Sequence, residues 1–357
     1  MRHSAIRLEH AGGGSGHVQA FAPGRANLIG EHTDYNEGLC LPFAIERGVT
    51  VTAKPLGDRR IEAFAQDLAQ SDAFALDGEI ERPQPSSWRL FVRGAVAELR
   101  REGIEPRPCR LEIAGEVPRG AGLSSSAALS VSLCLALCGV AGAEPPPALA
   151  LARLCSRIEN DWCGAQTGLL DQLAVLCGED GHALRIDFRT LELEQVPFDL
   201  GDWRLVTLDS GAEHEHAGGG YNERRAECEQ AREQLGLDSL RDAPPDPDLP
   251  DPLNRRVRHV VSENARVDAM IDALAAGDLP AAAELLDASH ASLRDDYEAS
   301  VPAVEAAVTA LKDAGAAGAR MVGGGFGGSV LALLPPGAAL LPGAFGVAPG
   351  PAARRLV

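Results

Sequence analysis

A short polar run, residues 23–36, concentrates side chains that could bind a ligand rich in hydroxyl groups. Its charged or titratable members include Arg25, Glu31, His32 and Asp34, in a segment punctuated by glycine. Carboxylates accept hydrogen bonds from sugar hydroxyls, and a buried polar pocket rejects ligands that lack them. We therefore predict a hydroxyl-binding loop between two strands. The alternative is a charged surface turn satisfied by its own Asn and Asp side chains.

A second run, residues 117–128, suits an anion. Gly120 and Gly122 let the backbone approach a ligand closely, three consecutive serines offer donors, and an apolar helix follows, whose N-terminus carries a positive dipole end. The two lysines of the chain, Lys54 and Lys312, follow no glycine-rich loop, which excludes a Walker-A loop and a protein-kinase lysine. The pattern favours a phosphate cradle without lysine over simple turn chemistry.

An acidic residue, Asp171, stands in the otherwise apolar stretch 168–177. A carboxylate is costly to bury unless it is paired or coordinates a cation. Asp171 is therefore a candidate general base with an arginine as its charge partner, and a helix-capping or solvent-facing Asp is the alternative. The glycine cluster 323–328 suits close backbone approach to a ligand, so we expect the two walls of one site to come from distant parts of the chain.

Other chemistry-bearing residues are given plainer interpretations. His214 and His216 would share one side of a strand, but without a third ligand we predict no metal there. The helix that contains residues 221–228 has acids and bases at neighbouring positions, typical of a solvated face. The eight cysteines form no Cys-x-x-Cys pair or metal spacing, which favours reduced thiols in a cytoplasmic protein.

Composition narrows the possible partners. The 357 residues carry 33 Lys plus Arg against 51 Asp plus Glu, a formal net charge of −18, which argues against nucleic acid and anionic membranes. The uncharged stretch 120–143 contains too many serines and glycines at its start for a membrane span. Residues 1–17 have no apolar signal-peptide core and are predicted to be a disordered leader.

Hydrophobic periodicity supplies the elements that must position these residues. Strands are predicted at 18–22, 48–53, 110–114, 182–187, 203–209, 320–322 and 329–334. Helices are predicted at 88–102, 127–140, 155–160, 164–177, 221–235, 255–276, 279–293 and 302–314. Strands that alternate first with buried and then with amphipathic helices indicate α/β or α+β layers. A boundary is expected near residue 180, and a mobile, solvated loop at 242–252.

Together these motifs resemble the galactokinases, a branch of the GHMP family of small-molecule kinases. The resemblance spans roughly residues 18–334 and rests on the ordered segments 23–36, 118–128, 168–172, 221–228, 259–266, 289–297 and 323–329. It implies a two-domain α+β fold, with a mixed-sheet N-terminal domain at 18–180, a ferredoxin-like C-terminal domain at 181–357 and the active site between them.

The same resemblance implies MgATP-dependent phosphorylation of galactose at its anomeric hydroxyl, giving galactose 1-phosphate and ADP, by a cytoplasmic monomer without nucleic-acid or membrane partners. Asp171 would be the base, and Arg25 would stabilise its charge and that of the transferring phosphoryl group. Sugar-contacting positions would be Glu31, His32, Asp34, Gly168 and Tyr221. Nucleotide-binding positions would be Trp88, Gly120, Ala121, Gly122, Leu123, Ser124, Ser125 and Ser126. Magnesium ligands would be Ser126 and Glu159.

Three features depart from the family pattern. Glu213 stands where many relatives carry Arg, Gly219 stands where many carry Ser, and the tail after Leu334 is short and rich in Pro, Gly and Ala. The first two positions concern sugar preference, so another hexose or an N-acetylhexosamine stays open as the acceptor. A non-catalytic sugar and nucleotide sensor is a third possibility, which the intact pair Asp171 and Arg25 opposes. The tail suggests that a terminal strand–helix element is trimmed.

Overall fold

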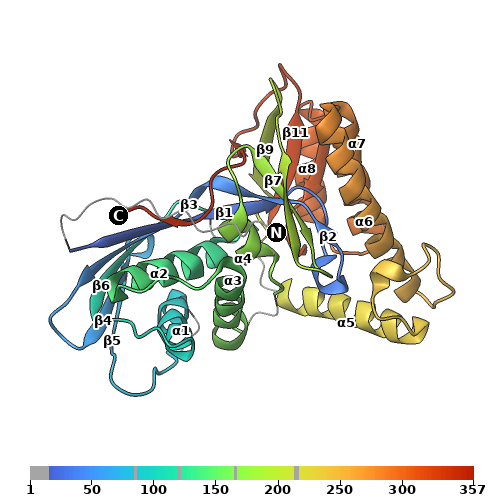
Figure 1. Ribbon diagram of the computed structural model, residues 1–357. Helices are drawn as coiled ribbons and strands as arrows, with labels where there is room; N and C mark the ends of the chain where they lie inside the picture. Colours follow the sequence, from blue (N-terminus) through green and yellow to red (C-terminus); the bar gives the residue numbers. More distant parts are fainter. Residues whose placement is uncertain (1–15, 84–86, 119–121, 165–166, 213–216) are drawn as a thin grey trace.

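The computed structural model describes residues 16–83, 87–118, 122–164, 167–212 and 217–357 (Figure 1). Its largest sheet is mixed. The strands lie in the order β13, β1, β3, β6, β4 and β5, with the bounds Arg354–Arg355, Val18–Asn27, Pro42–Pro55, Cys109–Gly115, Arg60–Ala65 and Gln70–Ala75. All neighbours are antiparallel except β4 and β6, which are parallel.

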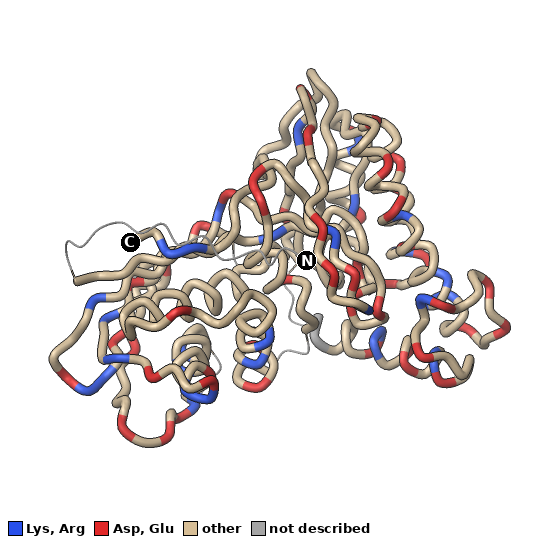
Figure 2. The backbone as a smooth tube through the Cα atoms, in the orientation of Figure 1, with Lys and Arg blue, Asp and Glu red and all other residues tan. Residues whose placement is uncertain are grey.

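Helices cover one face of this sheet. They are α1, α2, α3 and α4, with the bounds Trp88–Arg101, Ser125–Ala141, Ala148–Arg157 and Leu170–Cys177, and a short π-helix, η3, at Ile158–Trp162. Helix α2 packs along β1 and β3, at the centre of the first hydrophobic core (Figure 1). It carries no charged residue, whereas acidic and basic residues are intermixed over most other elements (Figure 2). A helix that is apolar all round is stable only when buried, as α2 is.

A second sheet of four strands forms the other half of the molecule. Its order is β10, β11, β9 and β12, with the bounds Gly318–Met321, Ser329–Leu334, Arg204–Asp209 and Phe345–Gly346. The helices of this half are α5, α6, α7 and α8, at Ala217–Leu235, Leu253–Ala276, Leu279–Asp295 and Pro302–Asp313. One face of the sheet joins a core with α8, and the other joins a core shared with the end of β1.

A small third sheet and the C-terminal tail link the two halves. The sheet has the order β2, β7 and β8, at Leu39–Cys40, His182–Asp187 and Glu192–Pro197. The tail after β11 does not end near its own sheet: β12 pairs with β9, and β13 then pairs with β1 on the far sheet (Figure 1). The C-terminal residues therefore close the edge of the first sheet.

The α+β fold with a mixed N-terminal sheet is confirmed, and the predicted elements are present with shifted ends. Strands β5 and β8 were not predicted, because their residues are mostly polar or exposed and give weak apolar alternation. Strand β4 was also not predicted, although Ile61, Ala63 and Ala65 alternate on its buried face. The segment 242–252 lies largely at the surface but is anchored by the ion pairs Arg189–Asp242 and Arg258–Asp246. Among the helices of the described ranges, none has both the length and the apolarity to cross a membrane.

Candidate active site

Arg25 lies on a strand, which corrects the prediction that the whole segment 23–36 is a loop. Strand β1 continues to Asn27, and its register with β3 shifts between Pro23 and Arg25. At this bulge the backbone N–H of Arg25 donates to the carbonyl of Leu123 at 3.1 Å. An added Cβ at Gly24 would lie 2.6 Å from the same carbonyl oxygen. The strand and the serine run thus pack backbone to backbone, which glycine permits.

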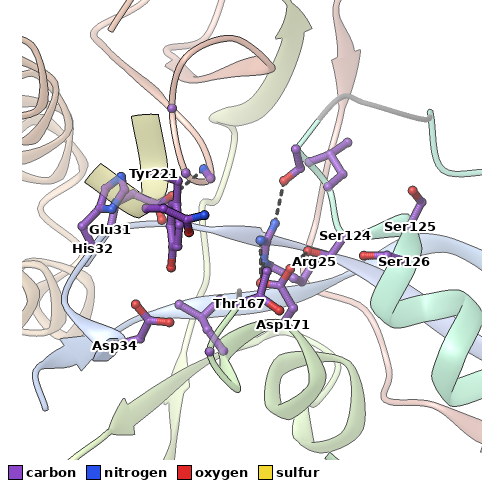
Figure 3. A pocket seen from close by; sticks show the side chains of 18 of the residues that line it. Arg25, Glu31, His32, Asp34, Ser124, Ser125, Ser126, Thr167, Asp171 and Tyr221 are labelled. Atoms are coloured by element: carbon purple, nitrogen blue, oxygen red, sulfur yellow. Dashed lines mark hydrogen bonds and ion pairs between the residues drawn. The ribbon is translucent and has the colours of Figure 1, made fainter. Parts of the chain in front are cut away.

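The side chain of Arg25 holds Asp171 in the first turn of α4 (Figure 3). Its Nε donates to Asp171 Oδ1 at 2.7 Å, its second guanidinium nitrogen approaches the same oxygen at 2.5 Å, and its third donates to the Gly122 carbonyl at 2.6 Å. The hydroxyl of Ser124 donates to Asp171 Oδ2. The expected arginine partner of Asp171 is therefore Arg25, and both carboxylate oxygens are oriented.

Glu31 is fixed from the opposite half of the molecule. The backbone N–H of Gly323 donates to its Oε1 at 2.8 Å, and the guanidinium of Arg320 lies 3.1 Å from the same atom. Arg320 is completely buried and also donates to the carbonyls of Asn27 and Leu28. Arg320 was not among the predicted site residues, because nothing near it on β10 resembles a polar motif. Its one local signal is an arginine within an apolar strand.

Burial shifts the pKa values of His32 and Asp34 in opposite directions. Burial, followed by the nearby His259, lowers the pKa of His32 to about 3, so its imidazole is neutral. Burial raises the pKa of Asp34 to about 6, and the backbone N–H of Tyr35 opposes this shift while the carboxylates of Asp171 and Glu31 add to it. Both side chains therefore carry less charge than they would in water.

Two glycines make room for these groups. A Cβ at Gly168 would lie 2.2 Å from Asp34 Oδ2, and one at Gly324 would lie 2.8 Å from the ring of Tyr221. Any larger residue at either position would displace a pocket side chain. This gives a steric reason for Gly168 among the predicted sugar-contacting residues.

These side chains converge on one pocket of about 420 Å³ (Figure 3). Its lining unites the predicted residues Arg25, Glu31, His32, Asp34, Gly122, Leu123, Ser124, Ser125, Ser126, Gly168, Asp171 and Tyr221. They come from β1 and the segment that follows it, the start of α2 with the residues before it, the start of α4 with the residues before it, and α5; glycines 323–325 of the glycine cluster complete the lining. Both halves of the chain line this pocket, as a site with walls from distant parts of the chain requires. The lining combines acceptors and donors, as a polyhydroxylated ligand requires.

A second pocket of about 420 Å³ adjoins the first at the start of α2. Both pockets share Ser125 and Ser126, and Trp88 lines the second one. Most of its remaining lining is apolar, including Val49, Leu68, Val117, Phe91 and Leu129. An apolar slot with one aromatic wall suits a planar heterocycle. The N-terminus of α2 therefore stands between a polar and an apolar cavity.

Glu159 lies beside the same helix end and offers hard oxygen donors. The Ser126 hydroxyl donates to Glu159 Oε2 at 3.1 Å, and the Gln172 amide donates to Oε1 at 2.8 Å. Burial, with the charge of Asp171 adding to it, raises the pKa of Glu159 to about 7. Among the residues that the structure describes, no group of three or more His, Cys, Asp or Glu side chains could hold a metal ion.

Some predicted positions are not covered. Gly120 and Ala121 of the phosphate cradle, the departure Glu213, and the pair His214 and His216 lie outside the described residues. Gly219 is in the first turns of α5, where it is exposed and an added Cβ would contact nothing. The helix predicted to show a solvated face at 221–228 also buries Arg224 and Cys228.

Comparison with known proteins agrees with this fold. Residues 90–179 match the GHMP kinases N terminal domain, and residues 270–340 match the GHMP kinases C terminal domain. These two matches, together with the two α/β halves of the molecule, identify the chain as a GHMP small-molecule kinase. Solved mevalonate kinases share this fold, one from Methanococcus jannaschii with a TM-score of 0.68 at 18% identity.

Further matches narrow the family from GHMP kinases in general to the galactokinases. Residues 9–55 match the galactokinase galactose-binding signature. The chain is 44% identical over 323 residues to a galactokinase of Mycobacterium bovis, covering 88% of each protein, and 40% identical over 328 residues to one of Streptomyces coelicolor, covering 88% of this chain and 83% of the relative. The Lactococcus lactis galactokinase, solved in complex with galactose, superposes with a TM-score of 0.86 at 34% identity over 94% of each chain. The chain belongs to the galactokinase family and is a sugar kinase.

Proposed function

We propose that this enzyme transfers the γ-phosphoryl group of ATP to the anomeric hydroxyl of galactose, giving galactose 1-phosphate and ADP. The observation that carries the proposal is the Arg25–Asp171 pair, which stands where the polar pocket meets the start of α2. We also propose a cytoplasmic monomer. All eight cysteines in the described chain are free thiols, which supports a reducing compartment.

Sugar recognition in this proposal rests on the polar pocket. The carboxylates of Glu31 and Asp34 accept hydrogen bonds from hydroxyl groups, and His32 and Tyr221 supply complementary polar groups. Because these groups are mostly buried, an acceptor sugar lacking a matching hydroxyl would leave one of them unpaired and bind less well. The Lactococcus relative solved with galactose supports this assignment of the ligand.

Asp171 is the proposed base. Its carboxylate accepts the proton of the anomeric hydroxyl as that oxygen forms its bond to the γ-phosphorus and the bond from phosphorus to the ADP oxygen breaks. Arg25 keeps the carboxylate oriented through Oδ1 and supplies a fixed positive charge beside the reacting groups. Phosphoryl transfer depends mainly on positioning and charge stabilisation, so a weak base is sufficient.

The nucleotide is assigned to the apolar pocket and the helix start. Trp88 and its apolar neighbours suit the adenine ring, and the N-terminus of α2 with Ser124, Ser125 and Ser126 suits the phosphates. Gly122 at φ +70° keeps this segment open to close backbone approach. The shared lining of the two pockets, Ser125 and Ser126, supports a phosphate site next to Asp171.

The residues present fit a magnesium ion. Ser126 and Glu159 offer a hydroxyl and a carboxylate oxygen, the donor type that Mg²⁺ prefers, and Mg²⁺ commonly takes few protein ligands alongside substrate phosphates. A nearby cation would also offset the burial that disfavours the ionised form of Glu159. When bound there, the ion would neutralise charge on the phosphates.

A sugar panel tests the proposed function. Purified enzyme is mixed with MgATP and, separately, with galactose, glucose, N-acetylgalactosamine and N-acetylglucosamine, and ADP release is measured. We expect galactose to give the highest kcat/KM. Turnover confined to another hexose or an N-acetylated sugar would overturn galactose as the acceptor. The absence of turnover on every sugar would overturn the proposed phosphoryl-transfer activity.

A further inference from the structure

All three tyrosines of the chain surround one pocket residue, His32. The ring centroids of Tyr35, Tyr221 and Tyr297 lie 5.9, 5.3 and 4.6 Å from that of the imidazole. Tyr221 lines the sugar pocket beside His32, whereas Tyr297 is fully buried behind it. The backbone of His32 has φ +59°, a left-handed conformation that a non-glycine residue adopts only when its surroundings hold it.

A chain of hydrogen bonds runs from the interior to this imidazole. The thiol of Cys228 contacts the Tyr297 hydroxyl at 3.0 Å, that hydroxyl contacts the Tyr35 hydroxyl at 2.7 Å, and the Tyr35 hydroxyl contacts His32 Nδ1 at 2.8 Å. At the other end of the imidazole, Nε2 is buried and has no hydrogen-bond partner among the described residues. His32 lines the pocket, so a bound ligand is the available partner for this atom.

Each link of the chain keeps its hydrogen. Burial raises the pKa of Tyr35 and of Tyr297 well above that of a free phenol, and burial raises the pKa of Cys228 to about 11. Each group therefore has one hydrogen to donate, and the three contacts all point either toward His32 or away from it.

The direction toward His32 is favoured by donor and acceptor strength. In that direction the Tyr35 phenol donates to the imidazole nitrogen of His32, which is a strong acceptor. The Cys228 thiol, which is a weak donor, then stands at the far end of the chain and donates to the Tyr297 hydroxyl. In the opposite direction a phenol would end on sulfur, a weak acceptor. In the favoured direction Nδ1 is the acceptor, and Nε2 carries the hydrogen.

We propose that Tyr35 and Tyr297 are positioning residues that hold His32 as a hydrogen-bond donor, with its Nε2–H directed to an oxygen of the acceptor sugar. The assignment of the ligand rests on the proposed function, whereas the tautomer does not. A sugar hydroxyl that donates to a carboxylate of the pocket can accept from Nε2–H at the same time. The buried chain thus makes the pocket selective for an oxygen acceptor at that position.

The tautomer is measured by ¹⁵N NMR of histidine-labelled enzyme without any ligand, with the His32 signals assigned from their loss in His32→Gln. We expect a protonated Nε2 and an unprotonated, hydrogen-bonded Nδ1. In Tyr35→Phe the Nδ1 shift should move to that of a nitrogen without a donor, whereas Cys228→Ser, which keeps a donor, should leave the tautomer unchanged. A protonated Nδ1 in the wild type would overturn the proposal even if galactose is the substrate.

Kinetics supply the second readout. Tyr35→Phe and Tyr297→Phe keep the aromatic rings and remove only the hydroxyls, so a role in packing alone predicts no change. We expect the sugar KM to rise about fivefold in Tyr35→Phe and less in Tyr297→Phe, with the ATP KM unchanged. Thermal unfolding shows whether each variant is folded. If one of the two variants is unfolded, the sugar KM of the other variant is the test. A folded Tyr35→Phe enzyme with an unchanged sugar KM would contradict the proposal.

Discussion

Arg25 contacts Asp171 Oδ1 through two nitrogens, at 2.7 and 2.5 Å, while its third nitrogen reaches the carbonyl of Gly122 at 2.6 Å. One side chain on β1 therefore links the acid on α4 to the segment that precedes α2. A planar guanidinium can do this because its donors are fixed in one fork.

Replacing Asp171 by Asn removes the proposed base and keeps the size of the side chain. We expect kcat on galactose to fall by about 10²- to 10⁴-fold, the range of a general base. ATP affinity, measured by calorimetry without sugar, should stay near the wild-type value, because the proposed adenine pocket does not include Asp171. A variant that turns over like the wild type would discredit the assigned base.

Replacing Arg25 by Lys keeps one positive charge but loses the fork. The ammonium cannot hold Asp171 and the Gly122 carbonyl together, so we expect kcat to fall about tenfold or more at saturating substrates. Arg157→Lys is a matched control, since Arg157 pairs with Glu98 and Glu102 away from the pocket. Equal losses in the two variants would show that the effect is general destabilisation.

Replacing Arg320 by Met leaves the Glu31 carboxylate with Gly323 as its hydrogen-bond donor. Removing one partner of a buried ion pair costs about 3 kcal/mol or more, so the midpoint of denaturant unfolding should drop. The KM for sugar should also rise about tenfold while that for ATP stays constant, because the freed carboxylate no longer has a fixed orientation. A destabilised enzyme with a normal sugar KM would restrict Arg320 to a structural role.

Asp34 makes sugar binding depend on pH. Its pKa is raised to about 6, so the carboxyl takes up a proton as the pH falls through that value and then loses acceptor capacity. We expect kcat/KM for sugar to decrease below about pH 6, since this ratio reports groups of the free enzyme. His32, with a pKa of about 3, stays neutral and adds nothing in this range. A profile that is flat down to about pH 5 would contradict the proposed role of Asp34.

The titration of the Glu159 carboxyl should make the magnesium requirement of the enzyme depend on pH. Without a cation its pKa is about 7, so protonation below that value competes with Mg²⁺. The Mg²⁺ concentration for half-maximal activity should rise as the pH falls from about 7 toward 6. Glu159→Gln should raise it at least about tenfold and remove this pH dependence. An unchanged Mg²⁺ requirement in the variant would remove Glu159 from the ion site.

The sequence indicated the fold class and most of the pocket because these depend on local patterns. A nearly continuous apolar run predicts α2, and apolar periodicity predicts α6. The segments around Arg25 and Asp171 carry their polar residues close together in the chain. Long-range partners leave no such pattern. Arg320 meets Glu31 across the two halves of the molecule, and Tyr297 meets His32 in the same way, so neither contact could be derived from spacing.

Local patterns also failed at edges and turns. The bulge that keeps Arg25 on β1 depends on close contact between Gly24 and Leu123, which neighbouring residues do not reveal. The tail after β11 was interpreted as a loss, yet Arg354 and Arg355 add an edge strand to the first sheet. A strand of two residues has too little alternation to be recognised without its partner.

In the proposed mechanism Asp171, held by Arg25, faces both the acceptor hydroxyl and the terminal phosphate. A crystal structure with galactose, Mg²⁺ and a non-hydrolysable ATP analogue tests it most directly. We predict an anomeric oxygen within about 3 Å of the Asp171 carboxylate, and the triphosphate at the N-terminus of α2. A galactose whose anomeric hydroxyl faces away from Asp171, or a triphosphate bound elsewhere, would rule out Asp171 as the base for this transfer.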